Sequence, residues 1–405
     1  MLSYLFRRIL LFFPTLIGAT AIIFMVMAMA PISIVDVLLP PGGDLLPGQR
    51  AVREQYIQER YGLNKPAYVQ YFRWLNKISP IGFETRQQDD PEVIDAKQQE
   101  LQQRTDRERQ LIASGVAPSA AADQARKIDL GPDAGEIRLN KPTFKKPDLG
   151  TSFIQSRPSI DRIKEALPIS IVLQLISLPI AISIALLTGI RAARLRGQFQ
   201  DKAISVVLLA LYSLPVIWVG VMLVGFFANV EYFKWFPTSG LHSLRADEMP
   251  FLPSFHDGFQ RGYLLDTLWH LVLPVICLSY GTVAFYSKLT RTALLEVLGT
   301  DYVRTARAKG LPEGVVTYRH AFRNSLLPLI TVAAGFLRLL VAGSVVVETI
   351  FGINGMGRLL IQSLKANDYE LFLSTSVFIL ILQLVGNLLA DILYVVADPR
   401  VSYDK

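Results

Sequence analysis

The sequence has few of the residues from which catalytic and metal sites are usually built. Its single cysteine, Cys277, excludes a disulfide within the chain and a zinc site made of cysteines. The four histidines are scattered, and no HExxH or GxSxG pattern occurs. The chain also lacks a GxxxxGK[ST] loop that could cradle nucleotide phosphates. We therefore expect no catalytic residue, no metal site and no cofactor.

Charge is scarce as well, because only 19% of the 405 residues are charged while 51% are hydrophobic. The apolar residues come in blocks, and about 20 such residues carry a helix across about 30 Å of hydrocarbon. We therefore predict an all-α integral membrane protein with six transmembrane helices. Four blocks, with at most one charge each, are residues 9–30, 168–190, 203–227 and 325–347; a fifth, 371–396, contains only Asp391, and 269–287 is weaker.

The first apolar block has flanks like those of a secretory signal. Two arginines precede it, and an Ala-Met-Ala sequence at 28–30 ends it with a small-x-small pattern. However, its 22 residues exceed the roughly 7–15 of a signal core, and Pro31 is a poor residue to follow a cleavage site. We expect residues 1–30 to be an uncleaved transmembrane anchor.

The positions of Lys and Arg near the membrane ends indicate the orientation. With the N-terminus inside, the inner segments hold fifteen of these residues and the short outer loops hold five. Because cytoplasmic loops carry an excess of Lys and Arg, both termini, including the tail at 397–405, are expected to be cytoplasmic. The net charge of +7 is mostly this topological bias, and no basic soluble face indicates nucleic-acid binding.

The first outer loop, residues 31–167, changes composition along its length. Residues 49–78 are rich in aromatic and apolar side chains, which favours packed helices. Residues 84–127 instead carry nine acidic, seven basic and eight Gln residues. Asp90-Pro91 and Gly115 would begin and end a polar helix there, which projects into solvent or bridges to a partner. Residues 129–147 are rich in Gly, Pro and Lys and are expected to be irregular.

Prolines lie inside several apolar blocks. In a membrane a proline is expected to kink a helix rather than end it, because neighbouring groups satisfy the freed carbonyl. The core at 168–396 should therefore contain five helices, some of them bent around a path, although prolines are also simply frequent in transmembrane helices. The prolines concerned are Pro14, Pro179, Pro215 and Pro274.

An inner connection at residues 288–324 is longer than a simple turn between two helices requires. Its seven Lys and Arg residues outnumber three acidic ones. Residues 301–309 predict a short helix, Gly310 predicts a break, and 314–323 predict a second helix. Such a pair is typical either of insertion into a groove on a soluble partner or of an amphipathic segment on the membrane surface. The predicted shared face of the first helix comprises Tyr302, Ala306 and Lys309.

The sequence of this connection resembles the coupling loop of permease subunits in binding-protein-dependent ABC importers. The matching stretches are DYVRTARAKGL at 301–311 and RHAFRNSLLP at 319–328. The B-type subunit of the dipeptide, oligopeptide and nickel branch is the most similar. The general loop begins Glu-Ala-Ala, where this chain has Arg-Thr-Ala at 304–306 and Gly310 four positions later. Further matches to that branch are YLFRRI at 4–9, YGLNKP at 61–66, DLGTS at 148–152, LP at 167–168 and 214–215, VETIF at 347–351, GMG at 355–357 and DPR at 398–400.

The resemblance implies a type I permease without enzymatic activity of its own, in a bacterial inner membrane. It further implies a second homologous permease, two ATPase subunits, a periplasmic or lipid-anchored binding protein and a peptide substrate. Residues 31–167 would then be periplasmic, with an insertion at about 80–145. Small side chains would let the loop enter an ATPase cleft, and basic ones would pair with its rim. The implied coupling residues are Arg304, Thr305, Ala306, Arg307, Ala308, Lys309 and Gly310.

Arg338 stands out because it lies about 12 residues into the block at 325–347, which is the fifth predicted span in chain order. An ionisable group at that depth is expensive, so it is expected either to face the translocation path and attract a peptide carboxylate or to form a structural bridge.

Two other functional classes are weighed against an importer subunit. An ion-coupled secondary transporter or channel usually shows internal repeats and several intramembrane carboxylates, which this chain lacks. A membrane-anchored sensor would leave the connection at 288–324 unexplained. The cargo stays open, because relatives of this branch carry dipeptides, oligopeptides, peptide antibiotics, nickel chelates or oligosaccharides.

Overall fold

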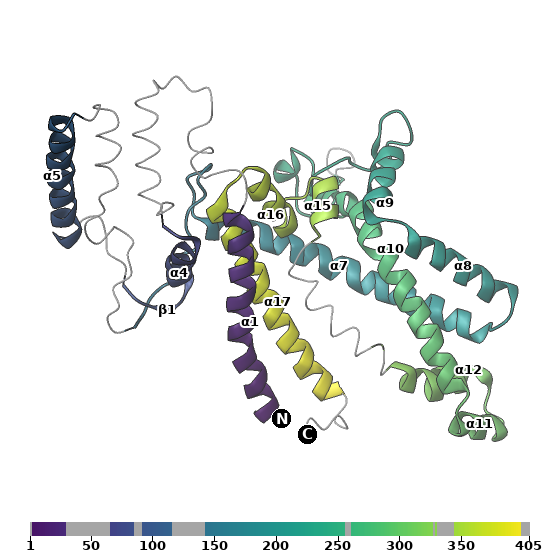
Figure 1. The fold of residues 1–405 in the computed structure, drawn as a ribbon. Helices are drawn as coiled ribbons and strands as arrows, with labels where there is room; N and C mark the ends of the chain where they lie inside the picture. Colours follow the sequence, from purple (N-terminus) through teal and green to yellow (C-terminus); the bar gives the residue numbers. More distant parts are fainter. Residues whose placement is uncertain are drawn as a thin grey trace. The chain divides into compact units, whose positions relative to one another are not determined.

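The computed structural model describes residues 2–29, 65–84, 91–115, 142–255, 261–326, 329 and 344–397. The chain forms two compact units. The first comprises Met1–Thr20 and Thr151–Lys405, and the second comprises Ala21–Gly150. Helix α1, Leu2–Ala28, contributes to both units (Figure 1).

The described part of the first unit is almost entirely helical. Its long helices are joined by short α, 3-10 and π segments, and only an isolated bridge between Thr151 and Pro158 has extended pairing. After α1 the elements are α7 Ser159–Arg194, α8 Phe199–Ser213, α9 Val216–Leu223, η1 Val224–Ala228, η2 Ala246–Glu248, α10 Gly262–Leu298, α11 Asp301–Ala308, α12 Glu313–Val315, η3 Val316–Phe322, α15 Val345–Ile350, α16 Met356–Lys365 and α17 Tyr369–Ala397.

Four helices within the described ranges are long and apolar enough to cross a membrane, and the pair α8 and α9 with η1 adds a fifth span if it counts as one. The predicted helical membrane fold is therefore confirmed at this coarser level. The predicted fifth span at 325–347 lies almost entirely outside the described residues, so the number six stays a prediction. The four are Leu10–Ala28, Ser159–Arg194, Gly262–Leu298 and Tyr369–Ile392.

Helices α7 and α10 pack along one another more extensively than any other described pair. The contact is close because small residues face it: a Cβ on Gly189 would lie 2.6 Å from the carbonyl oxygen of Ser287. The Thr188 hydroxyl lies 2.9 Å from the Ser287 hydroxyl, and the Ser279 hydroxyl donates to the carbonyl of Ser177 at 3.2 Å. Interhelical hydrogen bonds of this kind stabilise packing where lipid tails offer no hydrophobic driving force.

The prolines behave in two ways. Pro14, Pro179 and Pro274 lie inside continuous helices, as expected. Pro215 does not, because α8 ends at Ser213 and α9 starts beyond the proline at an angle of 96°. The prediction that residues 203–227 form one kinked helix is therefore wrong.

The break has a local and a tertiary cause. A residue before proline is biased away from helical geometry, and Leu214 is extended, with φ −80° and ψ 129°. Its carbonyl, which lies at the break between the two helices, accepts a hydrogen bond from the hydroxyl of Tyr280 on α10 at 2.7 Å. The helix can therefore end inside the apolar block without leaving that carbonyl unsatisfied.

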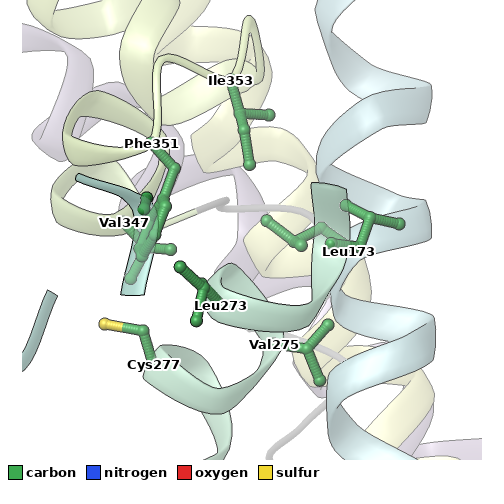
Figure 2. Close-up of a cluster of buried hydrophobic side chains, with 9 residues drawn as sticks. Leu173, Leu273, Val275, Cys277, Val347, Phe351 and Ile353 are labelled. Atoms are coloured by element: carbon green, nitrogen blue, oxygen red, sulfur yellow. The ribbon is translucent and has the colours of Figure 1, made fainter. Parts of the chain in front are cut away.

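A hydrophobic cluster joins α7, α10 and the segment from α15 toward α16. Figure 2 shows the side chains of this cluster between these elements. Ile353 is fully buried, although it lies in the turn after α15. This turn is therefore part of the core rather than a surface loop. The buried members are Leu173, Ala228, Leu271, Leu273, Val275, Cys277, Val347, Phe351 and Ile353.

The second unit contains α4 Ala67–Ile78, β1 Ile81–Gly82, α5 Pro91–Ala113 and β2 Thr143–Phe144. The strands pair antiparallel, with Ile81 opposite Phe144. Residues 129–147 were expected to be irregular, but β2 within them is a short strand. Within this unit, Phe24 stacks near Tyr71 and Trp74, which agrees with packed aromatic helices. The predicted polar helix is confirmed as α5, and Gly115 follows it at φ +90°.

Candidate functional site

The connection after α10 folds as the sequence predicts, into two short helices separated by a tight turn. The first helix is α11, and Thr300 before it is extended with its hydroxyl donating to the carbonyl of Val297 at 2.6 Å. Gly310 takes φ +76°, a conformation that glycine adopts without strain. The second helix begins as α12 and continues as the π-helix η3. A π-helix frequently marks a functional segment.

The inner faces of both short helices are buried against the ends of α7 and α10. Val303 and Leu294 are fully buried there, and Ala306 is 7% exposed. The surrounding cluster makes the connection one packed body with the ends of the two long helices. Its buried members are Ile190, Ala193, Leu294, Val303, Ala306, Val316 and Ala321.

This packing corrects the predicted shared face of α11. Ala306 points into the interior, whereas Tyr302 is 43% exposed and Lys309 is also exposed. Val303 and Ala306, three positions apart, form the buried stripe instead. The small side chain of Ala306 therefore lets α11 approach the protein's own core.

Arg307 joins the two helices of the connection across the turn. Its guanidinium donates to the carboxylate of Glu313 at 2.8 Å and to the carbonyl of Leu298 at 3.4 Å. The amide of Asn324 adds a hydrogen bond to the hydroxyl of Tyr302 at 2.7 Å. These contacts fix the relative position of α11 and η3. Arg307 thus has a defined role within the loop.

The outer face of α11 carries the remaining predicted residues. Arg304, Thr305, Ala308 and Lys309 are all exposed. Arg304 contacts Asp301 at 3.3 Å, but their side chains are 71% and 95% exposed, so this pair contributes little to stability.

Exposed apolar side chains also occur on the segment that follows α11. Leu311 and Val315 are each 36% exposed, and Tyr318 is 52% exposed. The guanidinium of Arg194 on α7 lies 5.8 Å from the centre of the Tyr318 ring. We call these three residues, together with Arg304, Thr305, Ala308 and Lys309, the outer face. It is small-residue-rich, basic and partly apolar.

A bidentate ion pair braces the same end of the first unit. Arg291 of α10 donates to both carboxylate oxygens of Asp201 on α8, at 2.7 and 2.8 Å. The backbone amide of Gly197 adds a third bond to Asp201 at 3.0 Å. Asp201 is buried, and burying an unpaired carboxylate is costly. The bidentate pair with Arg291 and the backbone bond offset this cost.

Two charged residues lie inside the predicted apolar blocks, Arg338 and Asp391. Arg338 lies outside the described residues. Asp391 forms an ion pair with Arg8 at 3.2 Å, which joins α17 to α1. Among the residues that the structure describes, no group of three or more His, Cys, Asp or Glu is arranged to hold a metal.

Sequence reasoning missed one buried polar group. Glu348 belongs to the VETIF motif noted above, but no role was derived for it, and it is fully buried and hydrogen-bonded to Ser170 of α7. The available signal was a carboxylate directly after an apolar block with a GMG sequence seven positions later.

Comparison with known proteins gives consistent matches. Residues 163–403 match the family described as "Binding-protein-dependent transport system inner membrane component". Over 404 residues the chain is 30% identical to the oligopeptide transport system permease protein AppB of Bacillus subtilis, covering all of both chains. It is 29% identical to the di/tripeptide transport system permease protein DppB of Pseudomonas aeruginosa over 417 residues, again covering both chains fully. A putative peptide transport system permease protein of Brucella abortus is 38% identical over 300 residues, which is 73% of this chain and 89% of its own.

Proposed function

Because the chain belongs to the family of binding-protein-dependent transport system inner membrane components, we propose that it is a pore-forming permease subunit of an ABC importer for peptides. The relatives' names support the cargo class, since they refer to oligopeptides, to di- and tripeptides and to peptides. As a permease of this family it is not an enzyme, and ATP hydrolysis belongs to separate subunits. A secondary transporter or a membrane-anchored sensor does not fit this family.

The observation that carries the mechanism is the packing of the connection at 288–324. Its helices are fixed to the ends of α7 and α10 by a hydrophobic cluster, and its outer face is left exposed. A rigid body that presents one free face is suited to transmit displacement from a soluble partner to the transmembrane helices. We infer that the outer face docks on an ATPase subunit and that α7 and α10 move with it.

The coupling residues then divide into two groups. Arg304, Thr305, Ala308 and Lys309 contact the ATPase directly, with the small side chains permitting close approach and the basic ones fixing register. The remaining residues, Ala306, Arg307 and Gly310, keep the loop in shape through burial, an ion pair to Glu313 and a left-handed turn.

Ala308→Asp tests the docking directly. The side chain is exposed, so the substitution should change the stability of the permease by no more than about 0.5 kcal/mol. At the interface it buries an unpaired charge, which costs several kcal/mol, and about 1.4 kcal/mol already lowers affinity tenfold. We expect the purified importer to lose ATPase subunits, or its ligand-stimulated ATP hydrolysis to fall at least tenfold.

Ala113→Asp is the matched control, since it makes the same change at an exposed helical position outside the loop. Hydrolysis would be measured with the binding protein carrying the ligand it retains on purification. Wild-type stimulation in Ala308→Asp, with the ATPase still bound, would show that this face does not couple.

The proposed assembly contains a second homologous permease, two ATPase subunits and a periplasmic or lipid-anchored binding protein. Both termini of this chain are cytoplasmic, and residues 31–167 are periplasmic. The ion pair between Arg8 and Asp391 supports this arrangement, because it joins the start of α1 to the last turns of α17. Two chain ends on the same side of the membrane require an even number of spans.

Arg338 is proposed to face the translocation path. Its depth in an otherwise apolar block supports a functional role over a purely structural one. Arg338→Leu should leave the yield of assembled importer near normal while lowering uptake of a radiolabelled peptide severalfold. Unchanged uptake by that variant would remove Arg338 from the path.

A further inference from the structure

A buried carboxylate lies where the segment after the fifth predicted span meets α7. Glu348 is fully buried in the described structure. It accepts hydrogen bonds from the Ser170 hydroxyl at 2.8 Å, from the backbone amide of Ser344 at 3.1 Å and from that of Arg358 at 2.9 Å. The backbone amide of Gly357 also bonds to it. A buried carboxylate is tolerated when donors surround it in this way.

Each of the four groups that bond to this carboxylate donates a hydrogen. Position 348 therefore requires a side chain that accepts hydrogen bonds and donates none. An ionised carboxylate offers about four acceptor positions and no donor. An amide at the same place would turn an NH2 group toward at least one of these N–H or O–H groups. The residue type at position 348 is therefore set by chemistry, not only by size.

Ser170 connects α7 to two elements at once. Its hydroxyl donates to Glu348 and accepts a hydrogen bond from the backbone amide of Met356 at 2.8 Å. Glycine permits this close approach: a Cβ on Gly355 would lie 2.5 Å from the Ser170 hydroxyl oxygen and 2.6 Å from the Glu348 carboxyl carbon. A Cβ on Gly357 would lie 2.6 Å from the amide nitrogen of Val345. We call Ser170, Ser344, Glu348 and residues 355–358 the polar clasp.

Helix α7 runs unbroken from the polar clasp to the connection after α10. Ser170 and Ile190 are 20 residues apart, which at about 1.5 Å per residue is about 30 Å, the thickness of the hydrocarbon core. At one end, Ile190 and Ala193 are buried in the cluster that holds α11. At the other end, Leu173 belongs to the same hydrophobic cluster as Val347 and Phe351, which flank Glu348 in the chain (Figure 2). The helix thus has one anchor at each end.

We propose that the polar clasp is the outer anchor through which α7 moves the segment α15–α16 during transport. Displacement of the outer face by the ATPase travels along α7, and the bonds of Ser170 and Glu348 pass it to α15 and α16. Glu348 and Ser170 are therefore positioning residues that act on the outer side of the membrane. This inference rests on the proposed function, because it needs the ATPase to act on the loop.

Two spin labels can follow the two ends of α7 separately. Arg323→Cys reports at the end of η3, and Lys365→Cys reports at the end of α16, since both side chains are exposed. The native Cys277 is 1% exposed and should not react. Nitroxide spectra would be recorded on the assembled importer in lipid nanodiscs, without nucleotide and with ATP, Mg²⁺ and vanadate. When the clasp residues are unsubstituted, the nitroxide spectra of both labels should change on adding nucleotide.

Ser170→Ala removes only the link from α7, because the bonds of Ser344 and Arg358 to Glu348 remain. In this variant the spectrum of the inner label at position 323 should change on adding nucleotide as it does without the substitution. The change at the outer label, position 365, should be at least threefold smaller. Glu348→Gln should behave alike. Ser159→Ala is the control: this serine is also buried on α7, but its hydroxyl has no hydrogen-bond partner among the described residues, so both labels should respond normally.

The outcomes separate this inference from the function on which it rests. A full response of the outer label in Ser170→Ala would overturn the role of the clasp, even if Glu348→Gln failed to assemble. If neither label responds in the unsubstituted protein, the proposed docking of the loop fails and the clasp inference fails with it.

Discussion

Two alanines of α11, two positions apart, show how the side of a short helix decides what a residue does. Ala308 is exposed, while Ala306 is 7% exposed and packs with Val303 and Leu294. Both were predicted from the sequence to contact an ATPase. The spacing within α11 permits several buried stripes, and only the position of α7 and α10 determines which one is used.

Ala306→Asp should therefore act on the permease itself. The new carboxylate would be buried in an apolar cluster without a partner, at a cost of several kcal/mol. We expect at least a severalfold lower yield of monodisperse permease on size-exclusion chromatography, and a lower midpoint of thermal unfolding. Ala308→Asp, the matched change on the exposed side, should keep a normal yield. Equal yields for the two variants would contradict the sidedness of α11.

At the scale of elements, the sequence predicts what depends on local pattern and length. Four of the six apolar blocks, the short helix predicted at 301–309 and the polar helix α5 follow from short-range signals, and the described structure contains them as helices. The break between α8 and α9 could not be predicted in the same way. Pro215 marks the place, but the choice between a kink and an end depends on Tyr280, which comes from another helix.

The polar clasp shows the same limit more strongly. Its central bond joins Ser170 to Glu348, which are 178 residues apart in the chain. The motif around Glu348 and its glycines is visible in the sequence, yet nothing local indicates that a serine of α7 bonds both Glu348 and Met356. The sequence could therefore name Arg304, Thr305, Ala308 and Lys309 of the outer face, whereas the attachment of the connection to α7 and α10 could be seen only in the tertiary structure.

For the whole molecule, the ion pair between Arg8 and Asp391 limits how many times the chain can cross the membrane. Helices α1, α7, α10 and α17 are long and apolar enough for four crossings, and the bent pair α8 and α9 adds a fifth if it counts as one span. The contact between Arg8 and Asp391 joins the first residues of α1 to the end of α17. Five crossings would leave the two chain ends on opposite sides. The sixth crossing that the sequence predicts at 325–347 would place both ends on one side, as the proposed topology requires. The excess of Lys and Arg on the predicted inner segments is the basis for proposing that this side is the cytoplasm.

This topology predicts which side of the membrane each exposed segment faces, and the single buried native cysteine gives a clean background for testing it. Gln102 is exposed on α5, and Arg323 is exposed after η3. A membrane-impermeant maleimide added to intact spheroplasts should label Gln102→Cys, because the proposed topology puts α5 in a periplasmic loop. It should label Arg323→Cys only after the membrane is permeabilised, because the same topology puts the connection at 288–324 in the cytoplasm. Labelling of Arg323→Cys in intact spheroplasts, with Gln102→Cys protected, would invert the orientation and place the docking face on the side without ATP.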